Sequence, residues 1–390
     1  MNILFTTHTY APNNDGVQFV TQYLAEGLVK LGHRVTVVTN LYPDRCNVKA
    51  ENINGVEVIR INAETIHTIH RGNRNEYIAF IKDNQNNFDI MINVCTQAAL
   101  TDWLFPIFDK IDIPKILYVH SIWDFKFNRE NFKSFKSFCG KLWANIRWSF
   151  YYKKWKDIFV KYDAVVQLHR MDYSYKFFKK RYGINSVIIE NAAEETFFST
   201  NVNSEIVVPQ KYIINVSNYI DRKNQFDCLK AFLTADIPED WELVLIGSRK
   251  TTYYEKLVNY YQNYQKKSSN SRKVHFLYSI PREQISTYVK KASLYIMTSK
   301  WEAFPISLVE SMAAGVPFIS SNVGIVKFFS GGIVADGIER YCYWLNRLTR
   351  DEVLRNHYGK MGRYEAFTHF KIDAKVKQLE SLLYRCVNAE

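Results

Sequence analysis

The chain has 390 residues, enough for two domains that each bury a core of their own. Apolar residues make up 47% of it and charged residues 23%, as in ordinary globular proteins, and the formal net charge is +12. The six cysteines are scattered without a Cys-x-x-Cys pair, which argues against a disulfide framework and against a zinc site. No secretion signal opens the sequence and no apolar run approaches the ~20 residues of a membrane span, so we expect a cytoplasmic chain.

The first half alternates expected strands and helices. Strands are expected at 2–7 and 34–39, on either side of a helix whose apolar residues recur from Val17 to Leu31. The loop before this helix contains Gly16, which would let a ligand approach the backbone closely; a plain surface turn is the alternative. Further strands are expected at 56–61, 89–94, 115–119, 164–167 and 186–189.

His120 comes directly after the expected strand 115–119. Ligands of open parallel sheets bind beyond the carboxyl ends of the strands, so a histidine at this place is a candidate contact for a hydroxyl or a phosphate. A histidine in the middle of a strand would more often be a core residue.

A basic and aromatic block follows at 126–181, with fifteen Lys and Arg residues against four acidic ones. Large rings recur between the cations from Phe127 to Tyr162. A helix with rings on one side and cations on the other can lie in a membrane interface, so we expect contact with an anionic membrane surface. The alternative is two ordinary helices that pack their rings into the core. Nucleic acid is not favoured as a partner, because no nucleic-acid-binding motif accompanies the block.

A polar stretch at 199–210 suggests the linker to a second domain. Strands are expected there at 212–216, 243–246, 274–277 and 294–297, with a helix at 281–292. The loop that leaves the first of these strands contains Arg222 and Lys223, a candidate pair of cations for an anionic ligand.

The stretch 298–324 contains two glutamates, Glu302 and Glu310, with seven residues between them. Pro305 favours the start of a helix at 306–314, which Gly315 would end before the next strand. The unpaired amides at such a helix start can hold an anion, and Phe304, Pro305, Ile306 and Ser307 form the candidate cradle. Carboxylates beside an anion are compatible with it if they bind flanking hydroxyls, and a ligand with hydroxyls on both sides of a diphosphate is a nucleotide-sugar.

Together with Gly315-Val316-Pro317 and Asn322-Val323-Gly324, this stretch resembles the Glu-x7-Glu signature of the retaining glycosyltransferases of family four, the group 1 type. The resemblance implies the α/β fold called GT-B, with two Rossmann-like parallel-sheet domains facing a cleft. It implies an acceptor domain at 1–200, a nucleotide-sugar donor domain at 211–366 and a C-terminal helix at 367–390 that packs back on the first domain.

The resemblance also suggests roles for the candidate residues. In that family the first glutamate, here Glu302, lies by the donor sugar, and the second, Glu310, holds the ribose hydroxyls. Lys223 matches a lysine that grips the diphosphate, and Arg222 is our conjecture for the arginine that Ser217-Asn218 replaces. The loop at Gly16 would face the donor's phosphates, and His120 stands where the family commonly has His-Gly.

We therefore expect a metal-independent enzyme that moves a sugar, with retention, from a nucleotide-diphosphate-sugar to a glycolipid or surface-polysaccharide hydroxyl. It would work as a peripheral protein on the cytoplasmic face of the plasma membrane. No cofactor is implied beyond the donor, and neither Asp-x-Asp nor Gly-x-Gly-x-x-Gly occurs in the sequence. Two alternatives stay open: a soluble sugar or sugar-phosphate synthase on the same fold, and a catalytically silent donor-binding subunit of a synthase complex.

Overall fold

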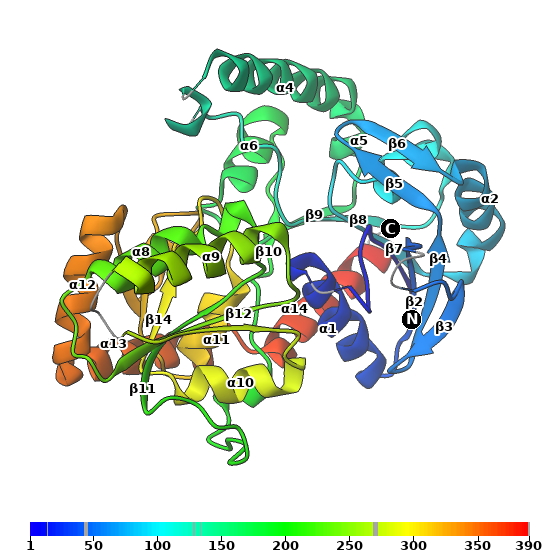
Figure 1. Ribbon diagram of the computed structural model, residues 1–390. Coiled ribbons are helices and arrows are strands. Elements are labelled where there is room, and N and C mark those ends of the chain that lie inside the picture. The colour runs from blue at the N-terminus through cyan, green and yellow to red at the C-terminus, as the bar shows by residue number, and fades with distance from the viewer. Residues whose placement is uncertain (14, 43–45, 128, 133, 268–271, 389–390) are drawn as a thin grey trace. The chain divides into compact units, whose positions relative to one another are not determined.

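The computed structural model describes residues 1–13, 15–42, 46–127, 129–132, 134–267 and 272–388, and Figure 1 shows its helices and strands. The chain divides into two compact units. Unit 1 comprises Met1–Glu190 together with Lys375–Glu390, and unit 2 comprises Asn191–Ala374. Within the described ranges, no helix is both long enough and apolar enough to cross a membrane.

Unit 1 is organised around a largely parallel sheet. Over its described residues this sheet has eight strands in the order β10-β9-β8-β7-β1-β2-β4-β3, and β3 is antiparallel to its neighbour β4. All the strands predicted for this half are present, whereas β3 and the hairpin of β5 and β6 were not predicted. The strands are β1 (Asn2–Thr6), β2 (Arg34–Asn40), β3 (Ala50–Ile53), β4 (Val56–Ile61), β5 (Ala63–Ile66), β6 (Ile69–Gly72), β7 (Ile90–Val94), β8 (Lys115–Val119), β9 (Ala164–Gln167) and β10 (Val187–Ile188).

The helices of unit 1 are α1 (Gly16–Lys30), α2 (Arg74–Asn84), α3 (Ala99–Asp102), α4 (Phe135–Lys154), α5 (Lys156–Val160), α6 (Tyr173–Tyr182) and the C-terminal α14 (Ile372–Val387). Helix α14 lies directly against α1, because Gly27 leaves room for the side chain of Val376, and a Cβ at Gly27 would overlap it. A hydrogen bond of 2.7 Å between His33 Nε2 and Glu380 Oε1 adds a polar contact. Leu379 and Leu383 lie on the buried face of this helix.

Unit 2 contains a second parallel sheet. Over the described residues its six strands run in the order β13-β12-β11-β14-β15-β16. They are β11 (Lys211–Val216), β12 (Trp241–Gly247), β13 (Val274–Tyr278), β14 (Leu294–Met297), β15 (Phe318–Ser320) and β16 (Gly332–Val334). The helices are α7 (Glu195–Phe198), α8 (Gln225–Thr234), α9 (Thr252–Lys267), α10 (Arg282–Lys291), α11 (Ile306–Ala313), α12 (Ile338–Arg350) and α13 (Glu352–His369). The predicted elements of this half are all found, whereas β16 and the helices α7, α8, α9, α12 and α13 were not predicted.

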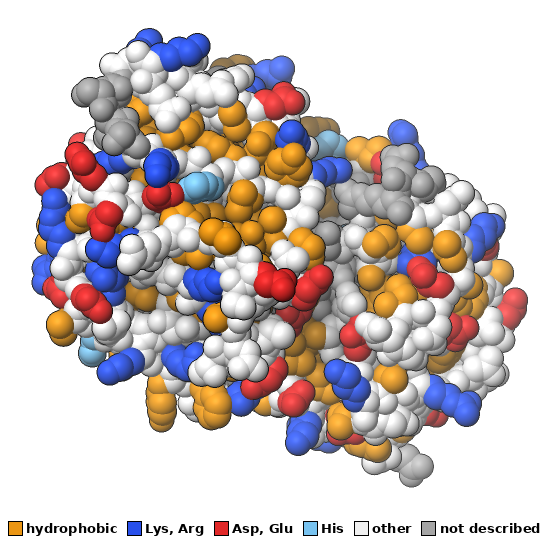
Figure 2. All heavy atoms as spheres, turned by 60° about the horizontal axis from the view of Figure 1, so that its bottom comes forward, with side chains coloured by type: hydrophobic (Ala, Val, Ile, Leu, Met, Phe, Trp, Pro, Cys, Tyr) orange, Lys and Arg blue, Asp and Glu red, His pale blue; other side chains and the backbone are white. Residues whose placement is uncertain are grey.

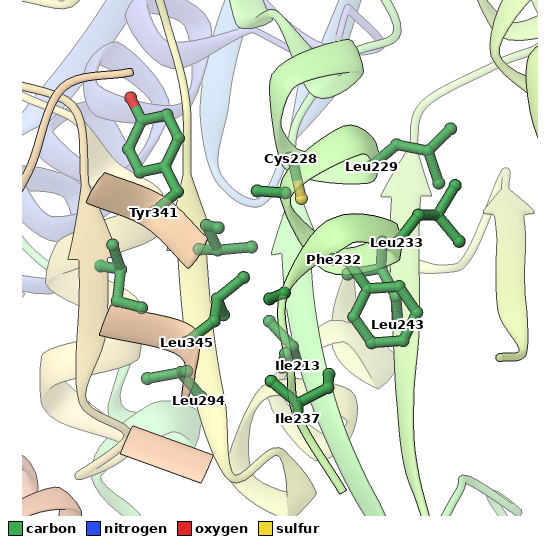
Figure 3. Close-up of a cluster of buried hydrophobic side chains, with 14 of the residues drawn as sticks. Ile213, Cys228, Leu229, Phe232, Leu233, Ile237, Leu243, Leu294, Tyr341 and Leu345 are labelled. Atoms are coloured by element: carbon green, nitrogen blue, oxygen red, sulfur yellow. The ribbon is translucent and has the colours of Figure 1, made fainter. Parts of the chain in front are cut away.

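The core of unit 2 forms where α8 meets the sheet and α12. Figure 3 shows Cys228, Leu229 and Phe232 of α8 among strand residues, with Leu345 of α12 close by. These side chains are fully or almost fully buried. Burial of this kind is the main source of stability for a domain of this size, at roughly 1.5–3 kcal/mol for each large apolar side chain.

The strand order reverses beside the first strand of each sheet. In unit 1, β1 lies between β2 and β7, and in unit 2, β11 lies between β12 and β14. Ligands of open parallel sheets bind beyond the carboxyl ends of the strands at such a reversal. The loops that follow β11 and β14 in unit 2, and β1 and β7 in unit 1, are therefore the places to look for ligand-binding residues.

The observed division of the chain differs from the predicted domain boundaries. It lies at Asn191, ahead of the boundary predicted at residue 200, because unit 2 binds the residues that follow. Asn191 Nδ2 donates to the Phe304 carbonyl at 2.9 Å, and the Arg363 guanidinium donates to the Phe198 carbonyl at 2.6 Å. The predicted linker 199–210 consequently belongs to unit 2, although it has no regular secondary structure. At the other end, the return to unit 1 comes at Lys375 and not at residue 367.

Candidate functional site

The predicted strand–loop–helix–strand unit lies in the sheet of unit 2. Strand β14 leads through residues 298–305 into α11, and β14 pairs in parallel with β15. Pro305 stands just before the helix in an extended conformation (φ −73°, ψ 110°), and its carbonyl accepts hydrogen bonds from the Leu308 and Val309 amides. The amides of the first helical residues, Ile306 and Ser307, have no acceptor within the helix. They are the part of the predicted cradle that can offer hydrogen bonds to an anion, since Pro305 has no N–H.

Phe304 anchors this loop to the rest of unit 2. Its ring is 5% exposed and contacts the rings of Phe329 and Phe370, with centroids 5.5 and 5.7 Å away. Its carbonyl accepts the hydrogen bond from Asn191. Phe304 therefore holds the start of α11 in place by its ring and its carbonyl.

The loops that leave β11 and β14 are joined by side-chain contacts. Lys223 Nζ lies 2.6 Å from Glu302 Oε1, and both side chains are largely buried. Beside this pair, Lys300 Nζ lies 2.7 Å from Asp221 Oδ2, at the surface. The structure thus brings together the two predicted residues Lys223 and Glu302, although 79 positions separate them in the sequence.

Arg222 lies in the same 3-10 turn as Lys223, Asp221–Lys223. Its guanidinium is positioned over the ring of Trp301, 5.4 Å from the centroid, and its carbonyl accepts from the Lys300 amide at 2.8 Å. Arg222 is solvent-exposed and adjacent to the Lys223–Glu302 pair.

Glu310 is buried on α11 and forms an ion pair that the sequence analysis did not predict. The Arg282 guanidinium, from the first residue of α10, donates to Glu310 Oε1. On its other side Arg282 Nε lies 3.4 Å from Glu194 Oε1. The pKa of the Glu310 carboxyl is raised above its ordinary value, because the effect of burial exceeds the opposing effect of the nearby Arg282. Arg282 could have been suspected only from its position at the start of a helix that follows a strand.

Gly324 fits closely against the loop that holds Glu302. Its φ is +53°, and a Cβ at this position would overlap the carbonyl oxygens of Ala303 and Glu302. The Ala303 carbonyl also accepts from the Ile325 amide at 3.3 Å. The predicted Asn-Val-Gly segment therefore packs against the backbone of the Glu302 loop. Only glycine suits both the positive φ and the short distance to the two carbonyl oxygens.

In unit 1, Gly16 is the first residue of α1, and Asp15 caps this helix. Asp15 Oδ1 accepts from the Gln18 amide at 3.0 Å, and Oδ2 accepts from Thr9 Oγ1 at 2.7 Å. A phosphate at the Gly16 amide would have to share the helix start with this carboxylate. The phosphate contact at Gly16 therefore stays a prediction, and it would place two anionic groups at one helix start.

His120 lies at the carboxyl end of β8, as predicted, and is 7% exposed. Its ring stacks on Tyr118, with centroids 5.0 Å apart. Burial lowers the pKa of His120 to about 3, and the neighbouring His8 contributes to the shift. The imidazole is therefore neutral and can exchange hydrogen bonds with a hydroxyl.

Two further residues near His120 were missed by the sequence analysis. His8 follows β1, and burial lowers its pKa against the opposing effect of Asp15. Cys95 follows β7 with a φ of +66°, and burial raises the pKa of its thiol to about 12. Their positions directly after strands could have marked them, by the same reasoning that selected His120.

The basic and aromatic block 126–181 contains α4. Two residues of the block, Asn128 and Lys133, lie outside the described part of the chain. Figure 1 shows α4 as a single long helix of unit 1. One face of α4 packs Trp148, Tyr151 and Tyr152 into the core. The block is therefore partly core, as the alternative interpretation held.

The opposite face of α4 is an exposed apolar stripe. Its residues recur at helical spacings and are 41% to 83% exposed: Phe135, Leu142, Trp143, Ile146 and Phe150. The helix also carries five cations and no acidic residue: Lys136, Lys141, Arg147, Lys153 and Lys154. On the face of the protein drawn in Figure 2, by contrast, basic and acidic side chains are interspersed.

Two family models match the chain. The model described as "Glycosyltransferase Family 4" matches residues 14–184, and the model described as "Glycosyl transferases group 1" matches residues 199–343. The chain is 26% identical over 136 residues to the GDP-Man:Man(3)GlcNAc(2)-PP-Dol alpha-1,2-mannosyltransferase of Mus musculus, which covers 33% of this chain and 28% of that one. The matched stretches span between 12% and 45% of the length of the curated relatives.

Solved structures share the fold over the whole chain. Sucrose-phosphate synthase from Thermosynechococcus elongatus superposes with a TM-score of 0.77 at 17% identity, covering 100% of both chains. WaaG, a glycosyltransferase involved in lipopolysaccharide biosynthesis, superposes with a TM-score of 0.65 at 16% identity and covers 98% of this chain and 99% of its own. With two parallel sheets in two units, these likenesses confirm the predicted GT-B fold class.

Proposed function

Because the chain belongs to the group 1 glycosyltransferases of family 4, we propose that it moves a sugar from a nucleotide-diphosphate-sugar to a hydroxyl of a glycolipid or surface polysaccharide. The observation that carries this proposal is the meeting of Lys223 and Glu302 at 2.6 Å, in the loop that leads to the start of α11. The loops at the strand-order reversal of unit 2 thus contain a cation, a carboxylate and the first amides of α11, which have no acceptor within their own helix. This combination suits a ligand in which a diphosphate is flanked by hydroxyls.

Each candidate site residue of unit 2 has a role in this proposal. Lys223 and the α11 amides neutralise the charge that develops on the departing diphosphate, and Arg222 joins them by leaving the Trp301 ring. Glu302 orients the donor sugar, and Glu310 binds the ribose hydroxyls. Protein cations carry the electrostatic task without a metal ion, which agrees with the lack of an Asp-x-Asp pair in the sequence.

His120 of unit 1 contacts a sugar or acceptor hydroxyl in this proposal. A neutral imidazole suits this part, because it donates one hydrogen bond and accepts another. We propose retention at the anomeric carbon, as the likeness to the Glu-x7-Glu family implies, with the leaving phosphate assisting removal of the acceptor proton. Gly16 would contact the donor by its backbone alone.

The acceptor class is supported by the likenesses and by α4. The name of the mannosyltransferase relative contains PP-Dol, and WaaG is described as acting in lipopolysaccharide biosynthesis. The exposed stripe of α4 and the cations of this helix suit an anionic membrane surface, where such acceptors are held. The likeness to sucrose-phosphate synthase concerns the fold and does not favour a soluble acceptor. Donor hydrolysis or transfer by the isolated chain would eliminate the silent-subunit alternative.

Binding of a nucleoside diphosphate tests the donor site. In a thermal-shift panel of UDP, GDP and ADP, we expect one nucleotide at a hundred times its dissociation constant to stabilise the protein by ~2.7 kcal/mol. In Glu310→Gln the same nucleotide should bind roughly tenfold more weakly or worse, because hydrogen bonds to a charged acceptor contribute about 1.5–3 kcal/mol. If none of the nucleotides shifts the wild-type transition, the donor site is wrong.

Flotation with vesicles tests the membrane contact of α4. The double variant Trp143→Ala/Phe150→Ala should bind vesicles of phosphatidylcholine and phosphatidylglycerol at least tenfold more weakly than the wild type, since each ring adds roughly 1.5–3 kcal/mol when buried. Tyr364→Ala is the matched control, because this ring on α13 is 74% exposed and outside the stripe. Equal flotation of all three proteins would rule out α4 as the contact. The wild type should bind vesicles of phosphatidylcholine alone more weakly, because the binding free energy loses ~1 kcal/mol for each cation near the surface.

A further inference from the structure

Arg282 lies between two carboxylates in unit 2. Its guanidinium donates to Glu310, whose side chain is 3% exposed, and its Nε lies 3.4 Å from Glu194 Oε1. The planar group also lies over the ring of Phe197, 5.3 Å from the centroid. Arg282 is fixed on three sides by Glu310, Glu194 and Phe197, yet its side chain is still 40% exposed.

The charges of Arg282 and Glu194 both change the pKa of the Glu310 carboxyl. Burial raises the pKa of Glu310, Arg282 lowers it, and the negative charge of Glu194 raises it. Burial opposes the charge of Arg282, but Glu310 and Glu194 outweigh burial and raise the pKa of the guanidinium. Arg282 is thus charged at every pH of interest, and both Arg282 and Glu194 influence the pKa of Glu310.

The other elements packed around Glu310 offer few further charges. Strand β14 contributes Tyr295, and burial raises the pKa of its hydroxyl. Helix α13 contributes Arg363, whose guanidinium donates to the carbonyls of Ala313 and Phe198. Arg282 and Glu194 are therefore the charged groups that control Glu310 directly.

We infer that Arg282 is a positioning residue of the donor site. It keeps Glu310 ionised and in one orientation for the ribose, and its ion pair with Glu194 weakens this effect. The inference rests on the proposed function, in which Glu310 binds the ribose hydroxyls. An ionised carboxylate only accepts hydrogen bonds and can take one from each of two hydroxyls. A protonated carboxyl must also donate, so it binds a pair of hydroxyls less well.

The test is the pH dependence of nucleotide binding. Titration calorimetry from pH 5 to pH 9 would use the nucleoside diphosphate selected by the thermal-shift panel. Affinity is high above the pKa of Glu310 and falls as the pH drops through it. In Arg282→Gln this midpoint should move upward by about one to three pH units, because an opposite charge near a carboxylate lowers its pKa by this amount. In Glu194→Gln the midpoint should move downward, because a neighbouring negative charge is lost.

Matched controls separate positioning from folding and from ligand titration. The phosphate of the nucleotide titrates near pH 6, so each variant is compared with the wild type at the same pH. Arg350→Gln, which breaks an ion pair of 3.0 Å with Asp236 at the surface of unit 2, should leave the profile unchanged. Arg282→Lys keeps the charge, so its midpoint should lie close to that of the wild type. This variant and Glu194→Gln keep the test possible if Arg282→Gln does not fold.

The result that overturns the inference is a profile of Arg282→Gln or Glu194→Gln that runs parallel to that of the wild type. A 2′-deoxynucleotide adds a second measure, because the loss caused by Arg282→Gln should shrink when one hydroxyl is absent. If Glu310→Gln itself binds the ribonucleotide like the wild type, the ribose assignment of the proposed function fails, and with it the basis of this inference. The two failures are thus told apart.

Discussion

Replacing Lys223 by alanine is expected to lower kcat/KM for sugar transfer by about two to three orders of magnitude. The removed ammonium is the cation placed to neutralise the leaving diphosphate, and the loss of one such electrostatic group typically costs 10²–10³ in rate. The variant also leaves the Glu302 carboxylate, 9% exposed, without its partner at 2.6 Å. We therefore expect a loss of roughly 1–3 kcal/mol in the free energy of unfolding as well.

The measurement is transfer or donor hydrolysis at a temperature where the variant is fully folded. Lys300→Ala is the control, because Lys300 lies in the same loop as Glu302 and forms an exposed ion pair with Asp221. Exposed pairs contribute about 0–1 kcal/mol, so its kcat/KM should stay within a fewfold of the wild type. Glu302→Gln should also lose transfer activity, although Lys223 is still present in this variant. Wild-type turnover in both Lys223→Ala and Glu302→Gln would defeat the site.

Replacing Gly324 by alanine should damage stability and donor binding together. The left-handed backbone at φ +53° costs a non-glycine residue roughly 1–2 kcal/mol. The added Cβ would also overlap the carbonyl oxygens of Glu302 and Ala303, so the loop that holds the Glu302 side chain has to shift. We expect a total loss of about 3 kcal/mol in the free energy of unfolding, in the range of severe single substitutions.

Gly183→Ala isolates the backbone contribution. Gly183 has a φ of +72°, and a Cβ there would meet nothing within 4 Å. Chemical denaturation of this control should show a loss of only ~1–2 kcal/mol. Calorimetry with the selected nucleotide should give weaker binding for the Gly324 variant and unchanged binding for the control. A Gly324 variant as stable as the control would show that the loop moves without cost.

The order of strands and helices could be predicted because its signals are local. Buried parallel strands are short apolar runs, and helices show apolar residues at helical spacing. Strands β4, β8, β9 and β14 have the predicted bounds. The missed strands β3, β5 and β6 are half-exposed segments with mixed polarity, and their pairing depends on neighbours that a single segment does not reveal.

The candidate site was partly predictable. Glu302, Glu310 and Lys223 were selected by spacing and by resemblance, and the structure brings Lys223 and Glu302 together. Arg282 was missed because the partner of a buried charge is set by how α10 packs on α11, and neither helix records this packing in its own sequence.

The sequence by itself determined the alternation of strands and helices, the fold class and the motif around Glu302, since each of these depends on residues close together in the chain. The tertiary structure decided which charges pair, which face of α4 is buried, and where the chain passes between the units. These features depend on contacts between residues far apart in sequence, such as Gly27 with Val376 and Asn191 with Phe304. Packing, and not local preference, selects such contacts, because a buried group is stable only where its surroundings complement it.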